Sequence, residues 1–127
     1  MKSAGLEKDL QKACLSRLSI WQMHKVVVYY QDISQFGLRY FRGNFIKRTH
    51  KGLPDIVAYV KYNQECHICF FELKTGTKQS DHQLDFMLKF KDLSNVWYDI
   101  IRNSDEIDNR IEILTNHYKN QLDKLCL

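Results

Sequence analysis

Two carboxylates and one lysine stand at the ends of two short apolar segments of the sequence. Asp55 opens one segment, and Glu72 and Lys74 close the next one along the chain. Neighbouring carboxylates repel one another unless a cation lies between them, and Mg²⁺ prefers oxygen ligands and keeps several waters. Lys74 would share a strand face with Glu72, because strand side chains alternate. The set predicts metal-assisted phosphodiester hydrolysis, in which metal and lysine stabilise charge on the phosphate and the metal acidifies an attacking water.

This prediction depends on the register of a β-hairpin. The segments 55–62 and 67–74 both show the alternation of a strand. If the chain turns at residues 63–64, Asp55 lies directly opposite Glu72 and within cross-strand reach. A slip of one residue would move Asp55 to the other face of the sheet.

The same residues resemble a nuclease motif. Pro54-Asp55, followed after residues 56–71 by Glu72-x-Lys74, is similar to the signature of the PD-(D/E)xK nuclease superfamily. The resemblance is closer to the VRR-NUC (virus-type replication–repair nuclease) family and covers most of the chain, from about Glu7 to the helix after Asp99. It is carried by Gly52-Leu53-Pro54-Asp55-Ile56-Val57, by Phe71-Glu72-Leu73-Lys74-Thr75 and by Gln83.

The resemblance implies a fold and an activity. The fold is an α/β restriction-endonuclease-like core in one domain, 1–127, with a mixed central sheet flanked by helices and the catalytic residues at one end of the central hairpin. The activity is that of a Mg²⁺-dependent endonuclease, with Mn²⁺ as a substitute, that cuts nicked, flapped or four-way-junction DNA in replication, repair or recombination. Short members that stand alone imply a homodimer.

The resemblance also implies roles for individual residues. Lys74 would orient or activate water and steady the phosphate charge. A glutamate on the N-terminal helix, best matched by Glu7, would bind a second metal or a bridging water. Gln83 is either an active-site residue or only the capping-box residue of its helix. The implied metal ligands are Asp55, Glu72, the Leu73 carbonyl and Glu7.

Each of these residues has a simpler interpretation. Asp55 after a proline is also typical of a turn, and Glu7 is also typical of a solvated acid in the first turn of a helix. Glu72 and Lys74 could form an edge-strand charge pair of little energetic value. Glu72, however, stands inside an apolar run, where an unpaired charge is costly. That position favours a ligand.

A cationic stretch before the motif is the candidate DNA contact. Aromatic residues are interleaved with the cations, which favours contact with a DNA backbone, although such a stretch can also be a solvated surface. The net charge of +4 is compatible with a polyanionic partner and does not require one. The predicted nucleic-acid-binding residues are Arg39, Arg42, Lys47, Arg48, His50, Lys51 and, after the second motif, Lys78.

The elements that must position these residues follow from the hydrophobic pattern. It predicts helices over 4–22, 80–92 and 105–125, strands over 25–30, near 38–46 and over 96–101, and the hairpin 55–74. This order gives a layered α/β domain. The apolar stripe of the last helix can face the core or a second copy of the chain, and the segment 36–46 is the other candidate dimer interface. The stripe consists of Ile107, Ile111, Leu114, Tyr118, Leu122 and Leu125.

The cysteines and the hydropathy of the sequence indicate the cellular compartment in which the protein acts. Cys66 and Cys69 would point to opposite faces of a strand, so they are a poor zinc pair. Four cysteines without an export signal predict reduced thiols in the cytoplasm, which includes a viral protein acting in the host cytoplasm. No apolar run approaches a membrane span.

Two further functions stay open: a Holliday-junction resolvase, and a catalytically idle DNA-binding or assembly protein with the nuclease fold. The intact acidic pair favours an enzyme.

Overall fold

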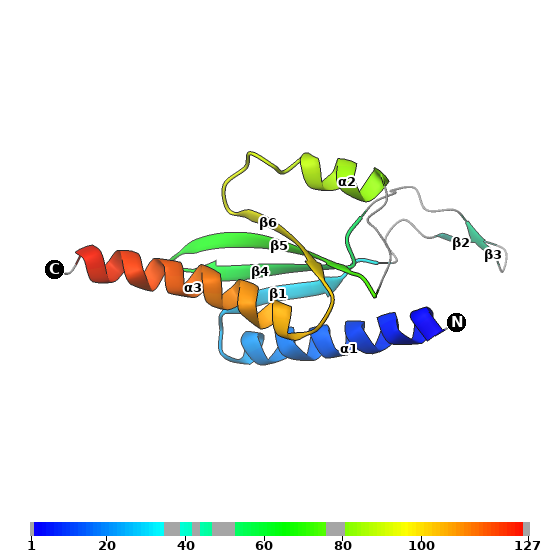
Figure 1. Ribbon diagram of the computed structural model, residues 1–127, viewed down its shortest axis with the longest axis horizontal. Coiled ribbons are helices and arrows are strands. Elements are labelled where there is room, and N and C mark those ends of the chain that lie inside the picture. Colours follow the sequence, from blue (N-terminus) through cyan, green and yellow to red (C-terminus); the bar gives the residue numbers. More distant parts are fainter. Residues whose placement is uncertain (1, 35–38, 42–43, 47–52, 76–80, 126–127) are drawn as a thin grey trace.

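The computed structural model describes residues 2–34, 39–41, 44–46, 53–75 and 81–125 (Figure 1). Its elements, in chain order, are α1 (Lys2–Met23), β1 (Val27–Asp32), β2 (Arg39–Phe41), β3 (Asn44–Ile46), β4 (Ile56–Tyr62), β5 (Glu65–Leu73), α2 (Asp81–Leu88), β6 (Val96–Ile101) and α3 (Asp105–Leu125).

Four of the strands form one sheet in the order β1-β4-β5-β6. β1 pairs antiparallel with β4 and β4 with β5, whereas β5 and β6 are parallel. Parallel neighbours need a crossover connection, and the segment that contains α2 supplies it. The expected mixed sheet is therefore confirmed. β2 and β3 pair only with each other.

The hairpin between β4 and β5 has the predicted register. Its pairs run from Ile56 opposite Phe71 to Tyr62 opposite Glu65. The two turn residues, 63 and 64, both have positive φ, at 49° and 69°. Two-residue hairpin loops of type I′ require this conformation at both positions, and their twist matches that of the flanking strands. The turn thus fixes which residues stand opposite each other at the far end of the hairpin.

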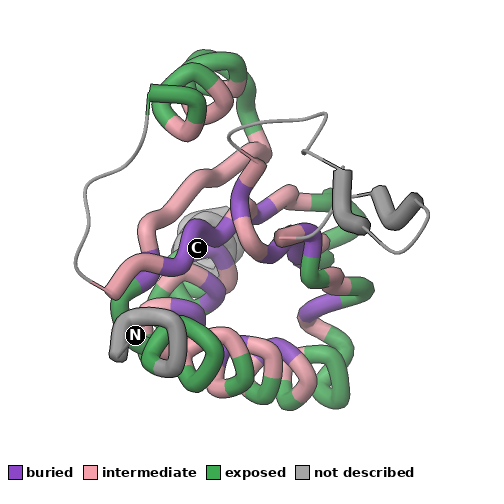
Figure 2. Tube along the Cα trace, turned by 90° about the vertical axis from the view of Figure 1, so that its right-hand side faces the viewer, coloured by how far each residue is buried: buried purple, intermediate pink, exposed green. Residues whose placement is uncertain are grey.

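The hydrophobic core lies on one face of the sheet. Figure 1 shows α1 and α3 on this face and α2 on the other. Buried residues gather in the strands and on the helix sides that face them (Figure 2). Asp108 of α3 joins the two helices, because it accepts hydrogen bonds from Arg17 Nε at 3.1 Å and Trp21 Nε1 at 2.8 Å. The core includes Cys14, Leu18, Val27, Ile56, Ala58, Val60, Cys69, Phe71, Ile101, Ile107 and Ile111.

The opposite face carries an aromatic cluster under α2, a helix with no fully buried residue. Phe70 of β5 lies 5.3 Å from Phe86 of α2 and 5.1 Å from Phe90, measured between ring centroids. Phe86 also approaches Tyr98 of β6 at 6.2 Å. Contacts between aromatic side chains at such distances add to the stabilisation from burial. They hold α2 over β5 and β6.

Several predicted boundaries need correction. β1 begins two residues later than expected because Lys25 has a positive φ of 64°, which interrupts an extended chain. The strand expected near 38–46 is two short strands, β2 and β3. The helix expected over 80–92 ends at Leu88, and the chain continues in turns with bonds such as Phe90 N–H to the Met87 carbonyl. Strand 96–101 and helix 105–125 are confirmed.

The stripe of α3 belongs to the core where it is described. Ile107 and Ile111 are fully buried and Leu114 is 6% exposed. The side chains of Tyr118, Leu122 and Leu125 lie outside the described residues, as does the helix cap expected at Ser80. In the described part of the chain, no helix is long and apolar enough to cross a membrane.

Candidate active site at the open end of the hairpin

Asp55 directly precedes β4, whose first residue, Ile56, stands opposite Phe71. Its backbone N–H donates to the Phe71 carbonyl at 3.0 Å, and its carboxylate Oδ2 accepts the Leu73 N–H at 2.8 Å. The predicted register, continued by one residue past the last printed pair, brings Asp55 to Glu72, and the charge of Asp55 acts on the Glu72 carboxyl group. The N–H and C=O of an extended residue point to the same side of its strand. The Leu73 carbonyl is accordingly directed toward the Asp55 side of β5.

Glu72 is the one charged residue that is buried among those whose burial the structure describes, with 3% of its surface exposed. Its carboxylate is held from several elements. Gln83 Nε2 of α2 donates to Oε1 at 2.5 Å, and the Tyr98 hydroxyl of β6 donates to Oε2 at 3.2 Å. Lys74 Nζ lies 3.9 Å from Oε1. Buried carboxylates need such partners, since leaving one unpaired is costly.

Burial and neighbouring negative charges raise the pKa values of both carboxyl groups. Burial, and then the charge of Asp55, raise the pKa of Glu72 to about 8, although Lys74 and the Tyr98 hydroxyl act in the opposite direction. Burial also raises the pKa of Asp55, opposed by the Leu73 N–H and reinforced by the charge of Glu7. Without an added cation, the two groups do not readily carry two negative charges at neutral pH.

Glu7 reaches the same edge of the sheet from α1. Thr75 Oγ1 donates to Glu7 Oε1 at 3.4 Å, and Gln11, one turn further along α1, donates to Asp32 at the end of β1. Within the described residues, no three histidine, cysteine, aspartate or glutamate side chains are arranged to hold a metal ion. Asp55 and Glu72 are thus a pair, with Glu7 beside Thr75.

The structure answers one alternative that the sequence left open. Gln83 lies in the first turn of α2 and directs its amide to Glu72, so its side chain takes part in the acidic site. Asp55 and Glu72 are likewise more than a turn residue and an edge-strand charge, because one carboxylate is buried and the other binds the neighbouring strand. Cys66 is exposed and Cys69 buried, which confirms that they face opposite ways.

Tyr98 and Thr75 are site residues that the sequence did not single out. Tyr98 reaches Glu72 only because β6 lies parallel to β5, with Tyr98 opposite Phe70 and Ile100 opposite Glu72. Strand alternation in 96–101 could have placed Tyr98 on one face. It could not have shown which strand β6 joins.

The predicted DNA contacts remain a prediction. The side chains of Arg39, Arg42, Lys47, Arg48, His50, Lys51 and Lys78 all lie outside the described residues. Figure 1 shows the short β2 and β3 strands beyond the same end of the sheet as the beginning of α1 and of α2.

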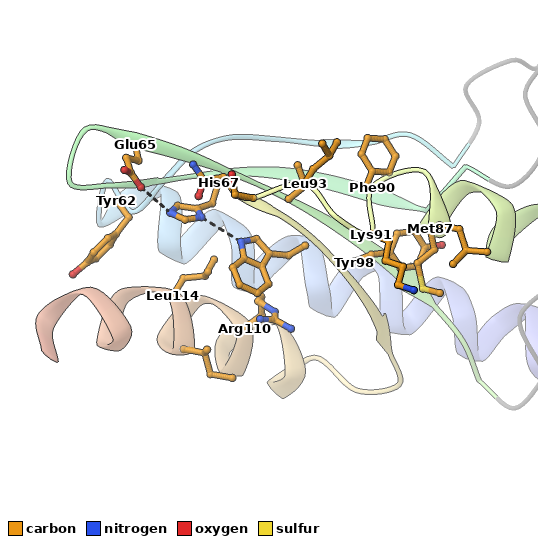
Figure 3. Close-up of a pocket in the computed structure, with 16 residues that line it drawn as sticks. Tyr62, Glu65, His67, Met87, Phe90, Lys91, Leu93, Tyr98, Arg110 and Leu114 are labelled. Carbon is orange, nitrogen blue, oxygen red and sulfur yellow. Dashed lines mark hydrogen bonds and ion pairs between the residues drawn. The ribbon is translucent and has the colours of Figure 1, made fainter. Parts of the chain in front are cut away.

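A cavity of about 770 Å³ lies beside β6 and reaches the turn end of the hairpin (Figure 3). Tyr98 lines it, but none of the five predicted catalytic residues does. Several of its polar groups contact one another: Trp97 Nε1 donates to His67 Nδ1 at 3.2 Å, and Arg110 lies 4.7 Å from the Trp97 ring centre. Arg110 also forms two hydrogen bonds of 2.7 Å with Asp99.

Comparison of the chain with models of protein families, with curated proteins and with solved structures gave no match in any of the three.

Proposed function

We propose that this protein is a metal-dependent endonuclease that hydrolyses phosphodiester bonds in DNA. The observation that carries the proposal is the buried Glu72, placed opposite Asp55 and beside Lys74 at the end of the central hairpin. Replacing buried charged groups with well-packed apolar residues is often neutral or stabilising. A fold that keeps two opposed carboxylates at a strand end therefore has a use for their charge, and perturbed pKa values of this kind gather at functional sites.

The residues present fit a hard divalent cation. The carboxylates of Asp55 and Glu72 and the Leu73 carbonyl offer only oxygen atoms, which suit Mg²⁺ or Mn²⁺ and leave room for the waters that Mg²⁺ retains. Glu7 is the candidate for a second ion or a bridging water. When bound, such an ion supplies Lewis-acid stabilisation of the phosphate and lowers the pKa of a water. It also relieves the repulsion that raises the pKa of Glu72.

The protein's own side chains do the positioning. Lys74, on the same strand face as Glu72, presents an ammonium that can orient water and stabilise the charge that develops on the phosphate. Gln83 and Tyr98 each hold one oxygen of Glu72, and the Leu73 N–H holds Asp55. These hydrogen bonds fix the two carboxylates before a substrate arrives. Groups arranged in advance need little reorganisation during reaction.

The proposal extends to fold, substrate and assembly. A mixed sheet whose central hairpin carries the acidic pair is compatible with a restriction-endonuclease-like core. The proposed substrates are nicked, flapped or four-way-junction DNA, the last of these as for a Holliday-junction resolvase. Because two strands of a junction need two active sites, we infer a two-fold homodimer. Ile107, Ile111 and Leu114 are buried in the core, so the candidate interfaces are the segment 36–46 and the later part of the α3 stripe.

The test is cleavage by the purified protein. Linear, nicked, flapped and four-way-junction DNA are each incubated with Mg²⁺, Mn²⁺ or excess EDTA. We expect cleavage with either metal and none with EDTA, and faster cleavage of at least one branched or nicked DNA than of linear duplex. Cleavage that persists in EDTA, or no cleavage of any DNA with either metal, contradicts the proposal. Light scattering at micromolar concentration tests the dimer.

A further inference from the structure

The sheet face that carries the acidic pair is only partly covered. On this face α2 packs over β5 and β6 through Phe70, Phe86 and Tyr98. Among the described elements, no helix packs over β1 and β4 on that side (Figure 1). Tyr29 of β1, opposite Tyr59 of β4, is 50% exposed. The two ring centroids are 6.1 Å apart, with 36° between the planes.

This tyrosine pair is not a displaced part of the core. Next to the pair on the same two strands, Val27 and Val60 point to the opposite face and are buried at 1% and 0% exposure. Beside the tyrosines the surface forms a shallow hollow of about 410 Å³, which also includes Val28, Lys61 and Glu65. The two rings therefore present aromatic surface to the solvent.

The pair lies on the same strand face as the candidate active site. Strand side chains alternate, so Val57, Tyr59 and Lys61 point to one face of β4, and Glu72 points to the same face from β5 because Ile68, four residues before it, stands opposite Tyr59. Val57, between Asp55 and Tyr59, is only 5% exposed, so the open part of this face begins at Tyr59. Four residues of extended chain place Tyr59 about 14 Å from Asp55, a distance that a few nucleotides of extended strand can span. Lys61 continues the row with a positive charge beyond the rings.

We propose that Tyr29 and Tyr59 form a stacking platform for the bases of an unpaired DNA strand connected to the scissile phosphate. Exposed aromatic rings near a cation bind single strands with little sequence preference, because every base offers a flat face. A closed duplex keeps its base faces stacked on each other, so the platform selects DNA with a single-stranded arm. This inference rests on the proposed function, since DNA is the substrate that the acidic site supports.

The test measures binding without cleavage. Full-length protein in EDTA is titrated into a fluorescent oligo(dT) and into a duplex of equal length. We expect Tyr29→Ala and Tyr59→Ala each to weaken binding of oligo(dT) about tenfold, the loss of roughly one stacked base, and to change duplex binding little. Tyr59→Phe keeps the ring and should bind as the wild type does. Met23→Ala, an exposed apolar residue at the end of α1 and outside the hollow, is the control and should leave binding unchanged.

A second measurement uses only wild-type protein, so it does not depend on whether the variants fold. An oligonucleotide containing 2-aminopurine should lose fluorescence on binding wild-type protein, because the base stacks on a ring. The absence of quenching, or equal losses for single strand and duplex in the alanine variants, overturns the inference. Tyrosine variants that convert a dimer to a monomer, with oligo(dT) binding unchanged per protomer, would also overturn it and make the face an interface between copies. Binding is measured in EDTA and cleavage is measured with metal, so one experiment can contradict the stacking platform while the other still supports metal-dependent cleavage.

Discussion

Two charged pairs on opposite faces of the sheet behave in opposite ways. On the face that α3 covers, Arg110 and Asp99 form a two-point ion pair, and the hydrogen bond to Asp99 raises the pKa of Arg110 and so favours its charge. On the other face, burial and the charge of Asp55 raise the pKa of Glu72 to about 8 and so disfavour its charge. The first arrangement is complete by itself, and the second needs a cation or a proton.

The cavities of the molecule do not mark the acidic pair. Arg110, His67 and Trp97 line the 770 Å³ cavity, whereas neither of the two described cavities is lined by Asp55 or Glu72. Large apolar pockets are a reasonable first hypothesis for a binding site. In this molecule the repulsion between the two carboxylates is the better indicator of a reactive site, because a bound cation would lower the energy of these two groups.

The largest expected effect separates the two pairs by catalysis. Asp55→Asn or Glu72→Gln should lower the rate of DNA cleavage about a thousandfold or more, because several kcal/mol of transition-state stabilisation is lost. DNA binding should stay intact or become stronger, since a source of repulsion toward phosphate is removed. Glu112→Gln, an exposed carboxylate of α3, is the control and should leave the rate within about twofold of wild type. Single-turnover kinetics with saturating Mg²⁺ provides the measurement, and full activity in either site variant would remove the distinction between the pairs.

The next effect concerns the placed lysine. Lys74→Ala should lower cleavage by roughly a hundredfold, the size seen when one preorganised charge-stabilising group is removed. Binding of Mg²⁺, followed by calorimetry, should persist because the oxygen ligands remain. Lys78→Ala should do much less, since Lys78 lies beyond Gly76 and outside the strand that carries Glu72. Equal damage from the two substitutions would show that general positive charge, and not the placement of Lys74, is what matters.

A change in the Arg110–Asp99 pair should affect stability and leave catalysis alone. Arg110→Met removes both hydrogen bonds to Asp99 and the contact with the Trp97 ring. We expect the free energy of unfolding to fall by about 2 kcal/mol, as for hydrogen bonds to charged groups in a partly buried setting. Urea denaturation measures this fall, and kcat of the folded variant should be unchanged. Adding Asp99→Asn should recover part of the loss, because no lone charge is then left behind.

The smallest effect is a pH dependence at the open end. The folded pKa of Glu72, about 8, lies above its ordinary value of 4.5. The protonated carboxyl therefore stabilises the metal-free fold at low pH, and this contribution is lost as pH rises from about 4.5 to about 8. Between pH 7 and pH 8 the loss should be about 1 kcal/mol. Glu72→Gln or saturating Mg²⁺ should flatten the slope in urea denaturation, and an equally steep slope in Glu72→Gln would assign it to another group.

Local pattern was enough to predict part of this geometry. Alternation in 55–62 and 67–74, with a two-residue turn between them, predicted the register of the hairpin, and the structure confirms this register from Ile56 opposite Phe71 to Tyr62 opposite Glu65. The helix 105–125 also followed from local periodicity, because its stripe faces the core. Both predictions involve residues that interact within one element or across one tight turn.

The rest depends on contacts that are distant in sequence. A glutamine three residues after a serine fits a capping box equally well, so only the packing of α2 shows that Gln83 binds Glu72. Tyr98 joins the site through a parallel pairing that no local signal specifies. Glu7 reaches Thr75 only because of the way α1 crosses the sheet. The positive φ of Lys25, which delays β1, has no signature in the residue type.

The attachment of α1 gives the site a mechanical dependence on a distant residue. Asp108 grips α1 at Arg17 and Trp21, while Glu7 lies about 15 Å nearer the N-terminus along the helix axis. A helix of this length moves as a rigid body, so a rotation about its contact with Asp108 displaces its N-terminal part. A tilt of roughly 5° about that contact would carry Glu7 through about 1 Å. Loss of the Asp108 hydrogen bonds, as in Asp108→Ala, would thus displace Glu7 from the acidic site without replacing any residue of that site.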